Sequence, residues 1–339
     1  MRAVAVLVLA SIFVAAPVIA APIDDAEAAI GKGEYATALQ LLRPLVDQGE
    51  PRAQWDLGNL YRHGSGVPQS YADAAKWYRL AADQGLGSAQ NNLGALYAAG
   101  QGVPQDYAQA MRWYRRAADQ GVAMGQFNVG VLYRAGQGVT QDYAQAMRWY
   151  RLAADQGLAL AQNELGALYQ AGHGVPQDYA EAIRWYRLAA DQGLALAHNN
   201  LGGLYEEGQG VPQDYAEAMR QFRLAADRGS VSAAYNIGLM YAQGRGVPEN
   251  KAEAAKWYML AANQGYALAQ NKLGVLYATG QGVPQDYIHA HMWFNLSAAG
   301  GDQAAAENLK HAAQVMTPAQ IIEAMKLARE WRPTRQLSQ

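Results

Sequence analysis

The sequence contains no cysteine in its 339 residues. Without thiols, the chain forms no disulfide, carries no lipid-modified cysteine and offers no thiolate to zinc. Charged residues make up only 17% of the chain, with 27 Lys+Arg against 29 Asp+Glu, and the formal net charge is −2. A chain this close to neutrality lacks the basic surface that nucleic-acid binding requires, so we expect no nucleic-acid partner.

The first twenty residues form an apolar run preceded by Arg2, and Val18 and Ala20 occupy the small-residue positions of a cleavage site. This pattern is typical of a secretory signal peptide. A short membrane anchor is the alternative, but Pro17 interrupts a run barely long enough to span ~30 Å. We therefore predict a signal peptide over residues 1–20 and a periplasmic or secreted mature protein. After cleavage we expect no integral membrane segment.

A Gly-Val-Pro step recurs along the chain at a spacing of 36 residues or a multiple of it. Thr140 stands where one proline is missing, and the prolines are Pro68, Pro104, Pro176, Pro212, Pro248 and Pro284. A period between about 20 and 50 residues indicates a solenoid, a propeller or an array, in which each unit buries its apolar face against its neighbours. A unit of this length has room for two helices and two turns.

The first half of each unit has the apolar period of a helix. Ala89, Leu93, Leu96 and Tyr97 fall on one helical stripe. Gly94 lies between them, although glycine inside a helix costs ~1 kcal/mol relative to alanine. Because a glycine recurs at this position, we expect another helix to approach closely there; the equivalents are Gly58, Gly130, Gly166, Gly202, Gly238 and Gly274.

The second half of each unit begins with a capping signal. Asp106 followed by Gln109 matches a capping box, in which the two side chains bond to each other's backbone N–H groups. Gly121 after the helix is consistent with a left-handed cap. Gly100 and Gly102 lack the third glycine and the preceding strand of a dinucleotide-binding loop, so we interpret them as turn residues.

The pattern Ala-x-x-x-Leu-Gly-x-Leu-Tyr-x-x-Gly-x-Gly-Val, followed by Tyr-Ala-x-Ala, Trp-Tyr and Ala-Ala-Asp-Gln-Gly, resembles the Sel1-like repeats, which are relatives of the tetratricopeptide repeats. Seven units match, opening at Ala53, Ala89, Gly125, Ala161, Ala197, Ala233 and Ala269. The resemblance implies an all-α fold, a right-handed α-solenoid of antiparallel helix pairs. It also implies that the first helix of each pair lines the concave side.

The ends of the array depart from the repeat. Residues 33–36 and 47–49 align with the second half of a unit, and Thr317-Pro318 matches the start of a last helix. We predict a signal peptide over 1–20, a tetratricopeptide-like helix pair over 21–52, seven repeats over 53–304, and a degenerate repeat with a capping helix over 305–339.

Positions that vary between repeats are free to face a ligand: the third, seventh, tenth and eleventh of the first helix. The third and seventh lie one helical turn apart and would form a stripe along the groove. Its amides suit the backbone of an extended peptide, and its aromatic rings suit side chains. The predicted groove residues are Trp55, Asn59, Asn91, Phe127, Val131, Asn163, Asn199, Tyr235, Leu239 and Asn271.

A structural role competes with ligand binding at the third position and at the neighbouring fourth position. At the third position the two interpretations stay equally open. At the fourth position we favour hydrogen bonds between neighbouring helices, because buried amides are usually satisfied within the protein. The residues concerned are Asn92, Asn128, Asn200 and Asn236.

The histidines do not form a catalytic or metal-binding pattern. None lies in a His-Glu-x-x-His pair, and His289 and His291 point to different sides of a helix. Ser65 follows His63 and Gly64, but the same place in the next unit holds no serine. We expect no catalytic residue, no cofactor and no metal, and therefore no enzyme.

We therefore predict a non-enzymatic scaffold or adaptor of the bacterial cell envelope that binds a protein or an extended peptide in the groove. The alternative is an envelope protein that binds polysaccharide or peptidoglycan, with Trp55, Phe127 and Tyr235 stacking on sugars. A third interpretation, a β-lactamase-like hydrolase, comes from cysteine-rich relatives whose repeats are each held by a disulfide, and this chain has no cysteine.

Overall fold

The structure, a computed structural model, describes residues 22–334, and every regular element in this range is a helix. The segment predicted to be a signal peptide lies outside the described residues. None of the helices in the described range has both the length and the apolar character needed to cross a bilayer.

The chain forms two compact units. Among the described residues, the first unit comprises 22–125 and 137–139, and the second comprises 126–136 and 140–334. The first unit contains α1 (Pro22–Gly31), α2 (Tyr35–Asp47), α3 (Pro51–His63), α4 (Tyr71–Asp83), α5 (Gly87–Ala99) and α6 (Tyr107–Asp119). Helix α7 (Ala123–Ala135) runs from the first unit into the second.

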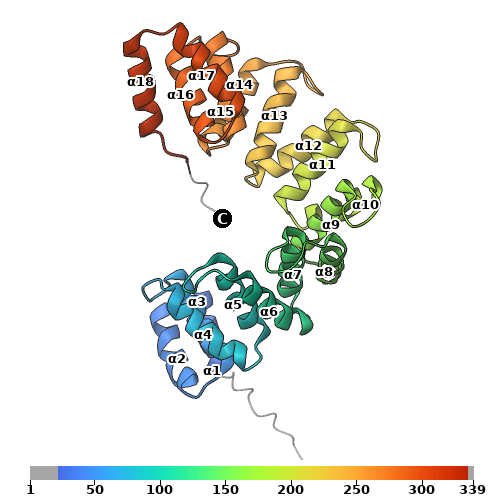
Figure 1. Ribbon diagram of the computed structural model, residues 1–339, viewed down its shortest axis with the longest axis vertical. Coiled ribbons are helices and arrows are strands. Elements are labelled where there is room, and N and C mark those ends of the chain that lie inside the picture. Colours follow the sequence, from blue (N-terminus) through green and yellow to red (C-terminus); the bar gives the residue numbers. More distant parts are fainter. Residues whose placement is uncertain (1–21, 335–339) are drawn as a thin grey trace, which may run out of the picture. The chain divides into compact units, whose positions relative to one another are not determined.

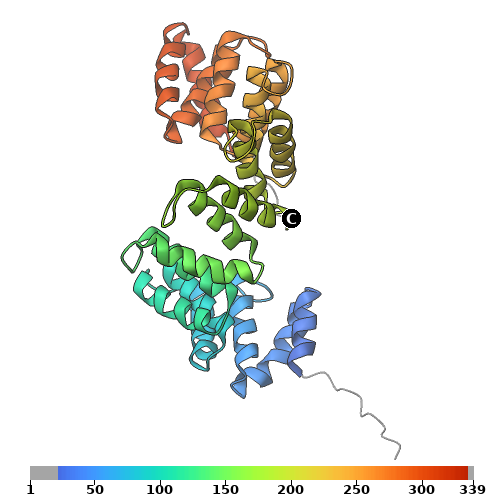
Figure 2. The same ribbon diagram turned by 90° about the vertical axis from the view of Figure 1, so that its right-hand side faces the viewer.

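The second unit continues the same alternation of helices. It contains α8 (Tyr143–Asp155), α9 (Ala159–Ala171), α10 (Tyr179–Asp191), α11 (Ala195–Glu207), α12 (Tyr215–Asp227), α13 (Val231–Gln243), α14 (Lys251–Asn263), α15 (Ala267–Thr279), α16 (Tyr287–Ala299), α17 (Gln303–Gln314) and α18 (Pro318–Glu330). Within each unit, successive helices pack as antiparallel pairs (Figures 1 and 2). We call the first helix of each pair from α3 to α16 the A helix and the second the B helix. The all-α solenoid of helix pairs predicted from the sequence is confirmed.

Two glycines shape the loop that joins the A helix to the B helix. Gly100 caps α5 in the left-handed conformation, with φ +67°. Gly102 also has a positive φ, and a Cβ atom there would lie 2.2 Å from the backbone carbon of Tyr71 in the preceding B helix. These glycines therefore form the turn and allow the loop to lie close to the preceding B helix. This agrees with the prediction that they are turn residues and not part of a dinucleotide-binding loop.

The predicted capping box of α6 is only half formed: the N-cap side chain accepts its hydrogen bond, and the return bond is missing. The Asp106 side chain accepts a hydrogen bond from the Gln109 backbone N–H at 2.9 Å, as predicted. The return bond from the third helical residue is present in α18, where Thr317 and Gln320 form both bonds. The prediction that the Gln109 side chain bonds back to the Asp106 backbone N–H was wrong, because the Asp106 side chain alone caps α6.

The glycine at the sixth position of the A helix admits an aromatic ring from the B helix. A Cβ atom on Gly94 would lie 2.7 Å from the ring of Tyr114, and the same holds for Gly166 and Tyr186. The Tyr186 side chain is fully buried. The predicted close approach is therefore confirmed, and the B-helix tyrosine is what makes it.

A buried glutamine at the second position of the A helix connects three helices. Gln90 Nε2 donates to the Ala82 carbonyl of the preceding B helix at 3.1 Å, and Gln120 Nε2 donates to Gln90 Oε1 at 2.8 Å. Gln162 makes the same two bonds in the second unit, with Ala154 and Gln192. Buried amides that bond on both sides fix the register of each pair against the next.

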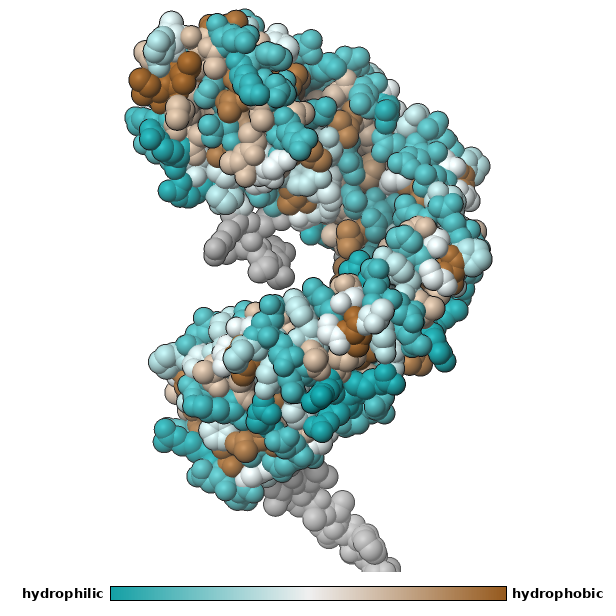
Figure 3. Space-filling model, in the orientation of Figure 1, coloured by the Kyte–Doolittle hydropathy of each residue, from teal (hydrophilic) through white to brown (hydrophobic). Residues whose placement is uncertain are grey.

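On the outer side of the B helices, an arginine of one repeat reaches the next. The Arg79 guanidinium lies 5.8 Å from the ring centroid of Trp113 and donates to the Tyr97 hydroxyl. Arg187 donates in the same way to Tyr205 at 2.7 Å. Cation–π contacts and charged donors therefore join consecutive pairs at the surface. Elsewhere the visible surface mixes hydrophilic groups with small apolar patches (Figure 3).

The carboxyl end of the second unit is covered by α18 and the segment after it. Helix α18 packs on α16 (Figure 1), and Met292 of α16 is buried, although B helices elsewhere carry arginine or lysine at this position. Trp331 meets Trp293 edge to face with centroids 6.2 Å apart, and the Thr334 backbone N–H donates to the Asn263 carbonyl at 2.8 Å.

Candidate functional site

The seventh position of the A helices lies on the face of each unit that the B helices leave uncovered. Asn59, Val131 and Leu239 are half-buried there, and Val275 is exposed. We call the surface that the seventh, tenth and eleventh positions of the A helices form within a unit the A-helix face. Its side chains are a mixture of amides, small apolar groups and single charges, among them Glu206.

The third-position asparagines are turned toward the next repeat. Asn163 is only 3% exposed, and its Oδ1 atom accepts from Asn200 Nδ2 at 3.0 Å. Asn199 accepts in the same way from Asn236 at 3.1 Å. In the last repeat, Asn271 accepts from Asn308 at 2.9 Å and donates to Asp302. Asn91 of the first unit is buried as well.

The fourth-position asparagines are the donors of these bonds. Asn200 and Asn236 donate to the preceding repeat, and Asn92 donates to Asn59 Oδ1 at 3.3 Å. The predicted bonds between neighbouring helices are confirmed at these three residues. Asn59 also accepts from the Tyr78 hydroxyl at 2.7 Å, so its carbonyl oxygen serves two partners.

The aromatic residues at the third position pack within their own repeat. The Phe127 ring lies 5.5 Å from that of Tyr150, and the Tyr235 ring lies 5.8 Å from that of Tyr258. Trp55 packs against the core cluster that contains Tyr78. The third and seventh positions thus differ in environment: the third faces the interior of the array, and the seventh is the more open of the two. Ligand binding by the third-position residues stays a prediction.

Asp56 occupies the fourth position of the first repeat, where Asn92, Asn200 and Asn236 of later repeats donate hydrogen bonds. Its side chain is 5% exposed, and its Oδ2 atom is buried with no hydrogen-bond partner. Burial raises the pKa of this carboxyl to about 7, with a further contribution from Glu27, while Arg52 acts in the opposite direction. A carboxyl group in this environment stays protonated at pH values at which an exposed aspartate has already lost its proton.

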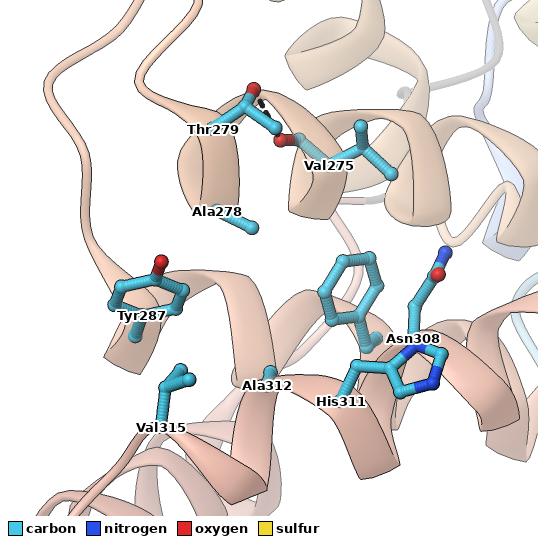
Figure 4. A pocket seen from close by; sticks show the side chains of 9 residues that line it. Val275, Ala278, Thr279, Tyr287, Asn308, His311, Ala312 and Val315 are labelled. Carbon is cyan, nitrogen blue, oxygen red and sulfur yellow. Dashed lines mark hydrogen bonds between the residues drawn. The ribbon is translucent and has the colours of Figure 1, made fainter.

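A cavity of about 300 Å³ opens between the A helix α15 and the following helix α17. Figure 4 shows Val275, Ala278 and Thr279 of α15 on one side and residues of α17 on the other. These α15 residues are the seventh, tenth and eleventh of the repeat, so the cavity lies in the A-helix face. Its remaining lining consists of Tyr287, Phe294, Asn308, His311, Ala312 and Val315.

The cavity has an apolar floor and a few polar groups. The Tyr287 hydroxyl accepts from Gln285 Nε2 at 3.1 Å, which leaves its own proton to donate. Asn308 uses its Nδ2 atom on Asn271, which leaves its carbonyl oxygen to accept. No Lys, Arg, Asp or Glu lines the cavity. An apolar pocket with few polar groups is the usual form of a binding site.

Of the residues that line this cavity, the sequence placed Val275 at the seventh position of its repeat, and it gave no sign of the lining residues from α16 and α17.

A second cavity, of about 260 Å³, lies in the first unit between α2, α3 and α4. None of the predicted groove residues lines it; its lining is Leu39, Leu42, Arg43, Val46, Asp47, Leu57, Tyr61, Val67 and Trp77.

Comparison with protein families gives matches to the Sel1 repeat at residues 51–86, 87–122, 123–158, 159–194, 195–230, 231–266 and 267–302. These seven consecutive repeats cover well over half of the chain. The chain belongs to the Sel1 repeat family. Sel1 repeat proteins are generally scaffolds for protein interactions rather than enzymes.

Among the similar solved structures, one that is more than 30% identical agrees with this assignment. A Sel1 repeat protein from Oxalobacter formigenes is 35% identical, with a TM-score of 0.66, over 85% of this chain and 86% of that chain. The protective antigen c5321 of uropathogenic Escherichia coli is 28% identical, with a TM-score of 0.37, over 87% of this chain and 86% of that chain. Human IFIT1, solved as a dimer with PPP-AAAA, shares the fold at 14% identity and a TM-score of 0.53, over 87% of this chain and 72% of that chain. The curated proteins gave no match.

The histidines of this Sel1 repeat protein are placed in separate environments. His198 Nδ1 pairs with Gln221 Oε1 at 2.7 Å, and His289 pairs with the N-cap Asp286 at 2.6 Å. Burial lowers the pKa of His291. Within residues 22–334, no group of three His, Cys, Asp or Glu side chains is arranged to hold a metal ion.

Proposed function

We propose that the protein is a non-enzymatic scaffold of the bacterial cell envelope, and that it binds an extended peptide segment of a partner protein along the A-helix face. The observation that carries the proposal is the cavity between α15 and α17, because it opens on the face whose seventh, tenth and eleventh positions vary between repeats. Export to the periplasm or to the outside of the cell is part of the proposal and depends on residues 1–20.

The composition of the A-helix face supports a peptide rather than a charged polymer. Val131, Leu239 and Val275 supply apolar contacts, and Gln170, whose Oε1 atom accepts from the Tyr186 hydroxyl, supplies an amide N–H group. Extended peptides are bound by such combinations of backbone hydrogen bonds and side-chain pockets. A glycan partner has less support, because it depended on aromatic rings, and Phe127 and Tyr235 stack on tyrosines of their own repeats.

Site-specific cross-linking in the native host tests this function. A photoreactive amino acid replaces Val131 or Leu239 on the A-helix face, and Leu152, 47% exposed on the B helix α8, serves as the matched control. We expect an envelope protein to be captured from the first two positions and not from Leu152. Capture of the same proteins from all three positions, or capture of cell-wall glycan alone, would contradict the proposal.

Cell fractionation tests the location separately. We expect the mature protein outside the cytoplasm, with an amino terminus near Ala21. A full-length chain that stays in the cytoplasm would overturn the envelope assignment and leave peptide binding untouched.

A further inference from the structure

The cavity between α15 and α17 lies where one side chain of the repeat is missing. The eighth position of the A helix holds a large aliphatic side chain, at most 5% exposed, in all seven repeats: Leu60, Leu96, Leu132, Leu168, Leu204, Met240 and Leu276. Helix α17 continues the series as the A-like helix of the degenerate repeat. Its eighth position is Ala312.

The repeats show what normally fills this place. Leu204 belongs to one core cluster with Tyr186 of the preceding B helix. Met240 clusters in the same way with Phe222, and Leu276 with Tyr258. Ala312 stands in the equivalent relation to Phe294. The aromatic partner of α17, Phe294, is therefore present and only 2% exposed, and an alanine stands where the repeats have the large aliphatic side chain.

The surroundings keep this place open and apolar. Val315 is 62% exposed and Val275 is 36% exposed, although both line the cavity. An apolar void of ~150 Å³ already accepts a benzene molecule. The volume of about 300 Å³ therefore has room for a leucine or methionine side chain together with part of its backbone.

We propose that this cavity receives a leucine-sized aliphatic side chain of the partner peptide, which takes the place that Leu204, Met240 and Leu276 fill within the array. The inference rests on the proposed function and identifies the side chain by which the peptide is anchored. Asn308 Oδ1 would accept from the peptide N–H, and the Tyr287 hydroxyl would donate to a peptide carbonyl. The lining contains no Lys, Arg, Asp or Glu, and although it includes His311, its mainly apolar character selects against Asp, Glu, Lys and Arg at this position of the peptide.

The test uses the mature chain and two small blocked amino acids, N-acetyl-leucine N-methylamide and N-acetyl-alanine N-methylamide. Binding is followed by NMR of labelled valine methyl groups, because Val275 and Val315 line the cavity. We expect the leucine compound to shift these two signals in a saturable way. The alanine compound should bind about tenfold more weakly or worse, since it buries far less apolar surface.

Two matched variants locate the binding. Ala312→Leu fills the cavity with the side chain of the other repeats, and we expect it to weaken the leucine compound at least ~10-fold. Ala304→Leu makes the same change at an exposed position of α17 that does not line the cavity, and binding should stay unchanged. If Ala312→Leu does not fold, Val315→Asp places a charge at the mouth of the cavity and should have the same effect.

Equal binding of the two compounds, or binding of the leucine compound to Ala312→Leu as tightly as to the natural chain, would overturn the inference. Cross-linking in the Ala312→Leu background separates this outcome from failure of the proposed function. Continued capture of the partner from Val131 and Leu239, without binding of the leucine compound, removes the anchor alone. Binding of the compound without capture of any envelope protein removes the scaffold function instead.

Discussion

At the scale of single residues, Asp56 is poorly suited to its buried position. The equivalent residues of two other repeats, Asn92 and Asn200, donate amide hydrogens from this position. A carboxylate cannot donate, and the buried Oδ2 atom of Asp56 has no hydrogen-bond partner. Burial therefore favours the protonated acid in the folded state, which is why the pKa rises to about 7.

The raised pKa predicts a pH dependence of stability that an asparagine removes. The unfolded chain releases the Asp56 proton near pH 4, whereas the folded chain holds it to about pH 7. Asp56 therefore contributes stability below pH 4 that is lost as the pH rises toward 7, by roughly 1.4 kcal/mol per pH unit at most. We expect Asp56→Asn to be more stable than the natural chain at pH 8, and to lose this part of the pH dependence.

Urea unfolding of both chains at pH 5 and pH 8, followed by circular dichroism, measures the difference. Aspartate and asparagine have nearly the same shape, so the difference between the two chains removes the contribution of all other titrating groups. Identical shifts of the unfolding midpoint in both chains would contradict the raised pKa.

Residue-scale reasoning from the sequence was right about the fourth position and left the third open. Asparagine suits both roles, binding a ligand and bonding to a neighbouring helix, so the residue type alone could not distinguish them. The structure shows that Asn163 and Asn271 face the next repeat. The distinction depends on the offset between consecutive A helices, which one unit of sequence does not contain.

At the scale of helix pairs, the sixth-position glycine decides how closely the A helix lies on its B helix. In α11 two glycines stand next to each other in different environments. A Cβ atom on Gly202 would lie 2.5 Å from the Phe222 ring, whereas a Cβ atom on Gly203 would have nothing within 4 Å. One helix thus contains both a required glycine and a free one.

Alanine at these two positions should have opposite effects. Gly202→Ala forces the Phe222 ring or the helix to move, and we expect it to destabilise the chain by about 1–3 kcal/mol. Gly203→Ala adds helix propensity without a clash and should be neutral or stabilise by up to ~1 kcal/mol. Thermal unfolding followed by circular dichroism compares the two variants. Equal loss in both would show that the aromatic contact does not require the glycine.

The boundaries of the helices were the best predicted feature of the pairs, because caps are local. Asp106 and Thr317 cap the helices they were expected to cap. The course of α18 could not be predicted in the same way. Its packing on α16 depends on a tertiary contact, and the one sequence signal was Met292 where B helices elsewhere have arginine or lysine.

At the scale of the whole molecule, stability comes from contacts between neighbouring pairs. Gln162 bonds to the carbonyl of the preceding B helix, and Asn200 bonds to the preceding A helix. Because these contacts join only neighbouring pairs within a unit, stability should be close to a sum over pairs and junctions. Such a chain tolerates the loss of a complete unit better than the loss of half of one.

Removal of residues 159–194, one complete repeat, should leave a folded protein. We expect the same helical signal per residue and a lower unfolding midpoint, because one pair and one junction are lost. Removal of residues 159–176 takes away α9 and its loop but keeps α10, which then has no A helix. This control should lose helical signal beyond the residues removed. A collapse of both variants would contradict the nearest-neighbour description.

The candidate anchor cavity shows where whole-molecule prediction from sequence stops. Ala312 is visible in the sequence as a small residue in a degenerate unit. Alignment of α17 with the other A helices places it at the eighth position, but that alignment lacks the sixth-position glycine and the ninth-position tyrosine that mark the repeat. Packing of Ala312 against Phe294 supplies the correspondence that the sequence had lost.

The arginine that lies over an indole of the following repeat has a consequence for observing the molecule. Trp113 lies beneath Arg79 and Trp185 beneath Arg151, each in a different unit. If two adjacent pairs slide or part, water reaches the indole and its emission moves to longer wavelength. Trp113 and Trp185 are therefore natural fluorescence probes of the contacts between their repeats and the preceding ones, and no added dye is needed.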